Sequence, residues 1–160
     1  MLNEQEFTYQ IMASVFVNAE ADIAPALWEH IRARHCSGLN RSNDIDGTNR
    51  TLGVFNRNYD VKALLRKALT NRKVLHALYV QYQKQGGAHR STVWCGQQKV
   101  SYDDANSIAV TIRLPENIGV SYTGTPNGVH KHTKKECARV TIVVRITKKG
   151  VEVRTMYPIP

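Results

Sequence analysis

Apolar residues recur at helical spacing in the first part of the chain. Ile23, Leu27 and Ile31 lie four residues apart, so they share one face of a helix. Asp22 directly before them can cap that helix, and the residues Cys36-Ser37-Gly38 after them would end it. The pattern therefore predicts a helix between these two signals.

A second helical region follows. Asp60 is expected to cap a helix that runs through Leu69, and Asn71 is expected to interrupt it. Residues 74–82 then fit either a helix or a strand. The run Gln85-Gly86-Gly87 predicts a break in the chain, because glycine favours turns over regular elements.

Two further segments have weaker patterns. Residues 4–19 fit a helix, although their β-branched residues also allow a strand. Residues 37–58 are rich in Gly, Asn, Asp and Arg, and they predict a polar loop that ends at Leu52-Gly53-Val54-Phe55. Because loops of this length without structure of their own are uncommon, we expect this one to be functional or mobile.

From Ser91 onward the pattern is typical of β-strands. Residues 139–147 are almost continuously β-branched, as in a central strand, and Lys148-Lys149-Gly150 predicts a tight hairpin after them. We expect residues 124–135 to form a basic loop, and Pro158 to end the last strand because proline cannot donate a ladder hydrogen bond. The predicted strands are Thr92–Cys95, Ile108–Leu114, Ile118–Tyr122, Arg139–Thr147 and Val151–Tyr157. The predicted fold class is α+β, with N-terminal helices packed on a twisted, mostly antiparallel β-sheet.

Charge is distributed unevenly along the 160 residues, a length that suits one domain with a core of its own. The net charge of +9 divides into −5 for residues 1–29 and +7 each for residues 30–75 and 76–160. We expect residues 1–22 to be an acidic extension or a packing helix, and residues 23–160 to be the functional domain. A basic domain favours a polyanionic partner such as RNA. No apolar run reaches the roughly 20 residues that span a bilayer.

Candidate catalytic residues lie near both ends of the chain. Thr155 and Tyr157 are two residues apart on the last predicted strand, so both hydroxyls project from the same face. His30 and His35 stand near the end of an early helix, and histidine is the side chain best matched to proton transfer near neutral pH. Arg41 follows, and its guanidinium can hold two phosphate oxygens at once. RNA cleavage needs such a base, acid and cation.

Together these residues carry a resemblance to a known family. The pattern His30-Ile31-x-x-x-His35, an arginine shortly afterwards and Thr155-x-Tyr157-Pro158 at the end resemble the bacterial RNase A-like toxin domains. These are C-terminal effectors of contact-dependent growth inhibition and related polymorphic toxin systems, similar in fold to the barnase–EndoU–colicin–RelE ribonucleases. The resemblance covers residues 28–160 in outline. Gly53-Val54-Phe55 and Asn117-Ile118-Gly119 are further elements that match it.

The resemblance implies an endoribonuclease that works without a metal or another cofactor. In such an enzyme the 2′-hydroxyl attacks the phosphate and leaves a 2′,3′-cyclic end, and tRNA is one candidate substrate. The family's second histidine, its arginine and its terminal Thr and Tyr form the active site, and they match His35, Arg41, Thr155 and Tyr157. Measured from His30, the spacing to Arg41 fits the family better, so either histidine is a candidate.

The resemblance also implies delivery into another cell. Such a domain is secreted as the C-terminal part of a larger effector and cuts RNA in the cytoplasm of a competing bacterium. The producing cell then needs an immunity protein, and an acidic one would suit a basic domain. Apart from that complex we expect a monomer.

Other basic residues are candidates for contacts with RNA phosphates. They are Arg34, Arg50, His130, Lys131 and His132. We expect no metal site among them.

Two alternative functions stay open. The basic loops could bind nucleic acid without cleaving it, in which case the histidines are incidental. Cys36 could instead act as the nucleophile of a hydrolase or transferase. Cys95 and Cys137 could form one disulfide, although three isolated thiols suit so low a cysteine content better.

Overall fold

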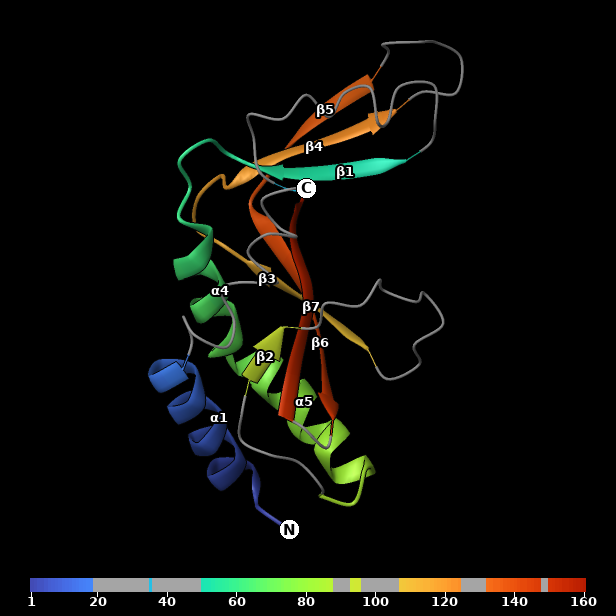
Figure 1. Ribbon diagram of the computed structural model, residues 1–160. Coiled ribbons are helices and arrows are strands. Elements are labelled where there is room, and N and C mark those ends of the chain that lie inside the picture. Colours follow the sequence, from blue (N-terminus) through green and yellow to red (C-terminus); the bar gives the residue numbers. More distant parts are fainter. Residues whose placement is uncertain (19–34, 36–49, 88–92, 96–106, 125–131, 148–149) are drawn as a thin grey trace. The chain divides into compact units, whose positions relative to one another are not determined.

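The computed structural model describes residues 1–18, 35, 50–87, 93–95, 107–124, 132–147 and 150–160 (Figure 1). Within these ranges the helices are α1 (Glu4–Asn18), α4 (Val61–Leu69) and α5 (Arg72–Lys84). The strands are β1 (Thr51–Phe55), β2 (Val93–Cys95), β3 (Ile108–Arg113), β4 (Gly119–Gly124), β5 (His132–Cys137), β6 (Arg139–Thr147) and β7 (Gly150–Ile159). These helices precede every strand except β1, and the predicted α+β fold class is confirmed.

The strands of the described chain pair in two sheets. One sheet has the order β1-β4-β5, and both of its strand pairs are antiparallel. The other has the order β2-β7-β6-β3, in which the short β2 runs parallel to β7. The chain groups into two compact units, and β3, β6 and β7 contribute residues to both. Unit 1 comprises Met1–Glu29, Val61–Val110 and Ile142–Thr155; unit 2 comprises His30–Asp60, Thr111–Thr141 and Met156–Pro160.

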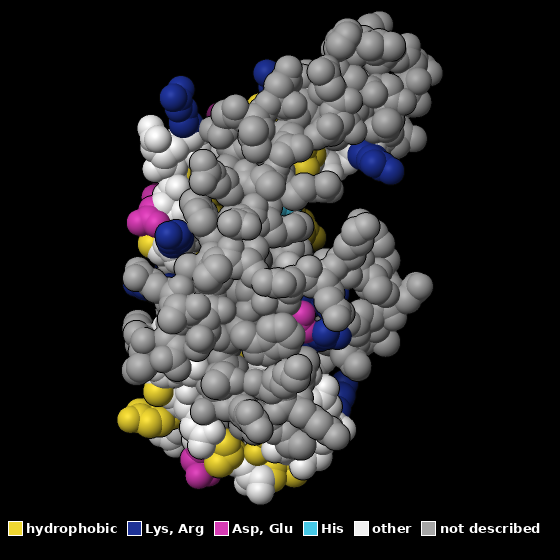
Figure 2. Space-filling model, in the orientation of Figure 1, with side chains coloured by type: hydrophobic (Ala, Val, Ile, Leu, Met, Phe, Trp, Pro, Cys, Tyr) yellow, Lys and Arg dark blue, Asp and Glu magenta, His cyan; other side chains and the backbone are white. Residues whose placement is uncertain are grey.

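A row of apolar residues on α1 forms part of the core of unit 1. Phe7, Ile11 and Val15 follow one another at a spacing of four and are 0% exposed. Phe7 stacks on Tyr82 of α5, with the ring centroids 4.9 Å apart. The sequence of residues 4–19 fitted either a helix or a strand. Burial at a spacing of four residues is typical of a helix, which is what α1 forms. Other apolar side chains remain outside: Tyr9 is 75% exposed, and Figure 2 shows hydrophobic side chains at the surface in the region of α1.

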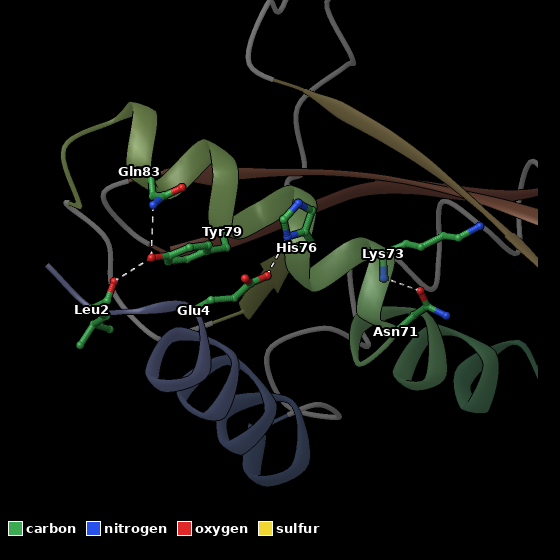
Figure 3. A network of polar contacts seen from close by, with 7 residues as sticks. All are labelled: Leu2, Glu4, Asn71, Lys73, His76, Tyr79 and Gln83. Carbon is green, nitrogen blue, oxygen red and sulfur yellow. Dashed lines mark hydrogen bonds and ion pairs between the residues drawn. The ribbon is translucent and has the colours of Figure 1, made fainter.

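Polar contacts fix the N-terminal segment on α5 (Figure 3). The backbone N–H of Leu2 donates to the Tyr82 hydroxyl at 2.7 Å, and the Tyr79 hydroxyl donates to the Leu2 carbonyl at 3.3 Å. The His76 ring lies 2.7 Å from the Glu4 carboxylate. Because the side chains of this last pair are 65% and 48% exposed, the pair contributes less than about 1 kcal/mol, and the apolar row on α1 dominates the packing.

Helix α5 begins at the interruption that the sequence predicts. Asn71 is its N-cap, and the Asn71 side-chain oxygen accepts a hydrogen bond from the N–H of Lys73 at 2.9 Å. The segment that fitted a helix or a strand is helical, because its apolar residues fall on one buried face. The buried residues are Val74, Leu75, Leu78 and Tyr82. Gly86 and Gly87 follow with φ of 73° and 83°, a conformation that glycine adopts readily, so the predicted break is confirmed.

Strand β6 is a central strand, as its branched sequence predicts. It lies between β7 and β3, and the apolar side chains on one of its faces, Val140, Ile142, Val144 and Ile146, are at most 2% exposed. The neighbouring β7 also buries a carboxylate, because Glu152 is 2% exposed. The Arg145 guanidinium of β6 donates a hydrogen bond to it, as a buried charge requires. Residues 148–149 of the predicted hairpin lie outside the described residues.

Three predictions about strands were wrong. Residues 51–55 form β1 rather than the end of a loop, and residues 132–137, largely assigned to a basic loop, form β5. Both are edge strands among the described strands of their sheet. Polar side chains of each are exposed, Thr51 in β1 and Thr133 to Glu136 in β5, which is why the two segments resemble loops in sequence. In addition, β7 continues through Pro158 to Ile159. The fixed φ of proline suits an extended chain, and its missing N–H matters only where a ladder bond would use it.

Replacement of the α5 cap tests the role of Asn71. Asn71→Ala should lower the free energy of unfolding by about 1 kcal/mol, because the Lys73 N–H loses its acceptor. Asn71→Asp is the matched control, since aspartate caps as well and its charge suits a helix N-terminus. Urea unfolding followed by circular dichroism measures both variants. Equal losses for the two would contradict the role of the side chain as a cap.

Candidate active site

The end of β7 packs closely against two glycines, Gly53 and Gly119, on one face of the β1-β4-β5 sheet. A Cβ atom at Gly53 would lie 2.0 Å from the carbonyl oxygen of Pro158. A Cβ atom at Gly119 would lie 2.4 Å from the Val54 carbonyl oxygen and 3.0 Å from the Pro158 ring. Neither site has room for a side chain, so backbone packs directly on backbone. Pro158 therefore lies on the sheet face toward which Gly53 and Gly119 would direct their side chains.

Burial alternates along the end of β7. From Arg154 to Ile159 buried residues alternate with half-buried ones, and Thr155 and Tyr157 are both half-buried. They flank the fully buried Met156. Since alternate residues of a strand point to the same side, the two hydroxyl-bearing side chains share the more open face of β7.

The His35 ring contacts both the glycine strand and the last strand. Its Nδ1 atom lies 2.8 Å from the carbonyl oxygen of Gly53, at hydrogen-bond distance. The centroid of the ring lies 5.6 Å from that of the Tyr157 ring, and the ring planes are inclined by 31°. His35 is helical and half-buried, while the rest of the predicted helix lies outside the described residues. His35, Gly53 and Tyr157 all belong to unit 2.

The pairing of β1 with β4 explains why the Gly53 carbonyl is available to His35. The N–H of Gly124 donates to Arg50, and the N–H of Asn56 donates to Ile118, so even-numbered residues of β1 bond to β4. Gly53 is odd-numbered, and its carbonyl therefore points away from β4. Among the described strands β1 pairs with β4 alone, so none of them uses the Gly53 carbonyl, and that carbonyl accepts the hydrogen bond from the His35 ring instead.

The contact with Gly53 determines how His35 can exchange protons. A carbonyl oxygen only accepts hydrogen bonds, so Nδ1 must be the donor and must carry a proton. In the neutral ring the basic nitrogen is then Nε2, and in the charged ring the carbonyl supports the imidazolium. This is the arrangement of a histidine that accepts and returns a proton at one defined atom.

The structure places only part of the predicted catalytic set. His35 and Tyr157 are brought together, and Thr155 shares a strand face with Tyr157. Five predicted residues lie outside the described residues: His30, Arg34, Arg41, His130 and Lys131. Cys36, the alternative nucleophile, also lies outside them.

Two of the residues predicted to bind RNA meet at one end of the β1-β4-β5 sheet. The carbonyl of Arg50 accepts the N–H of Gly124, and Gly124 is paired with His132, the first residue of β5. The Arg50 side chain is exposed. These two predicted residues, which are far apart in the sequence, therefore flank the same glycine.

The buried cysteine in the described chain is a free thiol. Cys137 is 0% exposed and forms no disulfide, so the alternative of a Cys95–Cys137 bridge was wrong. Burial raises the pKa of the Cys137 thiol, and the nearby charge of Arg139 lowers it less. The thiol form is therefore favoured, which suits a core residue rather than a nucleophile.

The sequence predicted neither the hydrogen bond between His35 and the Gly53 carbonyl nor the packing of Pro158 against Gly53 and Gly119. The signal was present in the segments Gly53-Val54-Phe55 and Asn117-Ile118-Gly119, which stood out only as elements of a family pattern. A glycine on a strand often marks a close approach of backbone, and both positions fit that rule.

No helix within the described residues is long and apolar enough to cross a membrane. Within the same residues, no cluster of three or more His, Cys, Asp and Glu side chains is placed to hold a metal ion.

Comparison with known proteins gives a distant structural likeness. No protein-family model and no curated protein sequence match the chain. Its fold is similar to that of one chain in the crystal structure of the CdiA-CT/CdiI complex from Y. kristensenii 33638. The two share 18% sequence identity and a TM-score of 0.48, over 82% of this chain and 99% of that chain.

A side chain at position 53 tests the close packing of Pro158 against Gly53. Gly53→Ala should lower the free energy of unfolding by about 1–3 kcal/mol, because the new Cβ atom overlaps a backbone oxygen. It should also abolish the nuclear Overhauser effect between the His35 and Tyr157 rings. A second substitution, Pro158→Ala, should not restore either property. The new Cβ atom at position 53 overlaps the backbone carbonyl oxygen of residue 158, and alanine has the same carbonyl as proline.

Gly86→Ala is the matched control. Gly86 has open space around it and a positive φ of 73°, so alanine there costs about 1–2 kcal/mol of backbone strain and touches nothing. The contact between the two rings should survive in this variant. Loss of the ring contact in both variants would show that general destabilisation, not the close packing of Pro158 against Gly53, is responsible.

Proposed function

We propose that this chain is an endoribonuclease toxin that cleaves RNA by acid–base catalysis. The observation that carries the proposal is the His35 ring, which is held by the Gly53 carbonyl and packed against the Tyr157 ring. The net charge of +9 supports a polyanionic substrate. The pattern of His30, His35, Arg41, Thr155 and Tyr157 supports the RNase A-like class of toxin domain.

The proposed reaction begins at the ribose 2′-hydroxyl. Nε2 of His35 removes the proton of this hydroxyl, and the 2′-oxygen attacks the neighbouring phosphorus atom. A 2′,3′-cyclic phosphate forms as the bond from phosphorus to the 5′-oxygen breaks. The 5′-oxygen leaves with a proton, for which His30 is our candidate donor. Charge therefore builds up on the phosphate oxygens midway through the step.

Three side chains are assigned to that developing charge. The Tyr157 hydroxyl lies on a ring that packs against His35, and Thr155 projects from the same strand face. Both can donate hydrogen bonds to phosphate oxygens, which are worth most when the acceptor is charged. Arg41 is proposed as the bidentate cation. His35 thus moves the proton, while these groups stabilise the phosphorane.

The cellular role follows from the same resemblance. We propose that the domain is secreted at the C-terminal end of a larger effector, enters a competing bacterium and degrades RNA in its cytoplasm, with tRNA as one candidate target. An acidic immunity protein would protect the producing cell by covering the basic surface. The supporting features are the positive charge and the sequence pattern.

One assay separates this proposal from its alternatives. The purified chain is incubated with total RNA in EDTA, and the ends of the products are analysed. Fragments with 2′,3′-cyclic phosphates support the proposal. Binding without cleavage supports a non-catalytic RNA-binding domain. Activity that is lost in Cys36→Ser but retained in His35→Ala supports a thiol-dependent enzyme instead.

Removal of the imidazole should disable the enzyme. His35→Ala should lower kcat for RNA cleavage by about 10²–10⁴-fold, because the proton of the 2′-hydroxyl loses its acceptor. His76→Ala is the matched control: His76 is an exposed histidine of α5 that pairs with Glu4, and its loss should leave cleavage unchanged. Single-turnover cleavage of a labelled RNA measures both. A parental rate in His35→Ala would remove His35 from the mechanism.

The Tyr157 hydroxyl can be tested with the ring kept in place. Tyr157→Phe should lower kcat by about ten- to hundredfold, the value of a hydrogen bond to a charged group. Tyr59→Phe is the control, since the Tyr59 hydroxyl donates to Glu116 within the same unit. The same cleavage assay applies. If both variants keep full activity, the ring packs against His35 without taking part in the chemistry.

A further inference from the structure

A row of threonines lies on the sheet face that also carries Pro158. Thr51 of β1 is opposite Thr123 of β4, and Thr123 is opposite Thr133 of β5. Directly opposed residues point to the same face, and Thr51 is two residues from Gly53, so this row lies on the face where Pro158 packs against Gly53. Three hydroxyl-bearing side chains therefore line the sheet beside the candidate active site.

The threonine hydroxyls retain hydrogen-bonding capacity toward a ligand. Thr51 Oγ1 and Thr123 Oγ1 are 3.1 Å apart, and a bond between them uses one hydrogen of the two. The Thr133 hydroxyl donates to the backbone oxygen of Thr123 at 3.4 Å, which leaves its lone pairs as acceptors. Thr51 and Thr133 are exposed. The row thus offers both a donor and acceptors, without charge, at the surface.

A lysine stands on the same face in the adjoining row. Gly53 is opposite Ser121, and Ser121 is opposite Lys135, so Lys135 shares the face of the threonines. Lys135 is exposed. Its neighbour Lys134 points to the other face, where its ammonium lies 5.5 Å from the centroid of the Tyr122 ring. Adjacent lysines of one strand therefore serve opposite surfaces.

The position of the row relates it to the proposed reaction. Gly53 supports both Pro158 and His35, and Thr51 is the next residue of β1 on the same face, about 7 Å further along the strand. That distance suits the nucleotide next to the phosphate under attack. Groups that both donate and accept match the edge of a nucleobase, which presents donors and acceptors, whereas ionised phosphate oxygens only accept.

We propose that Thr51, Thr123 and Thr133 form a subsite that reads the edge of one unpaired base, and that Lys135 binds the adjoining phosphate. This inference rests on the proposed ribonuclease function and names its substrate as single-stranded RNA, because the edges of an unpaired base are open to side chains, whereas the deep, narrow major groove of an RNA duplex closes the edge that lies in it. Base preference comes from the threonines, and affinity without preference comes from the lysine.

Cleavage of short RNAs tests the threonines. Four single-stranded oligoribonucleotides differ only in the base beside the cleaved phosphate, and kcat/KM is measured for each. The wild-type chain should prefer one base class. Thr51→Val and Thr123→Val, which keep the side-chain shape, should reduce that preference by about tenfold, the value of a lost hydrogen bond. Thr8→Val on α1 is the control and should keep the preference.

Binding at several salt concentrations tests the lysine. The probe is an RNA with a 2′-O-methyl group at the cleaved position, which cannot react. Lys135→Gln should weaken binding equally for all four bases and reduce the slope of log affinity against log salt by about 0.7, the value of one phosphate contact on a single strand. Lys134→Gln should change the slope less, because that side chain faces the opposite surface.

The outcomes of these measurements are distinct. A wild-type chain that cleaves RNA with equal kcat/KM for every base, or threonine variants with an unchanged preference, overturn the base subsite while the ribonuclease assignment stands. Equal effects of Lys134→Gln and Lys135→Gln overturn the assignment of the phosphate to this face. A wild-type chain that cleaves none of the RNAs overturns the proposed function and this inference with it.

Discussion

The close packing of the Pro158 backbone on Gly53 is the constraint on which the rest of the site depends. A Cβ atom at Gly53 would lie 2.0 Å from the Pro158 carbonyl oxygen, so glycine is required there. The same residue presents its own carbonyl to Nδ1 of His35. One glycine therefore positions both the end of the last strand and the imidazole, and the rings of His35 and Tyr157 meet as a result.

The character of β7 changes along its length. Its residues from Gly150 to Arg154 are buried throughout, whereas from Thr155 onward buried and half-buried residues alternate. Thr155 and Tyr157 are two residues apart in this alternating part of the strand. Glu152 in the buried segment is paired with Arg145, and the half-buried Thr155 and Tyr157 follow it along the strand.

Local pattern predicted the helix at 61–69 and the central strand β6, and it left residues 74–82 open between a helix and a strand. The helices each bury one apolar face, and such burial produces a periodic pattern in the sequence. The strands β1 and β5 were missed because the burial of their side chains has no strand period: β1 changes from exposed Thr51 to three consecutive buried residues, Gly53, Val54 and Phe55. For Thr133 to Glu136, which are all exposed, the sequence contained nothing that distinguishes a strand from a basic loop.

The sequence alone determined that the chain has N-terminal helices, a β-rich second half, a strong positive charge and two hydroxyls on one face of its last strand. Only the tertiary structure decided that His35 meets Tyr157 and which backbone oxygen orients its ring. Periodicity reports which side chains are buried, not which distant segments touch. The contact of His35 with Gly53 depends on a backbone carbonyl, and that group is the same in every residue.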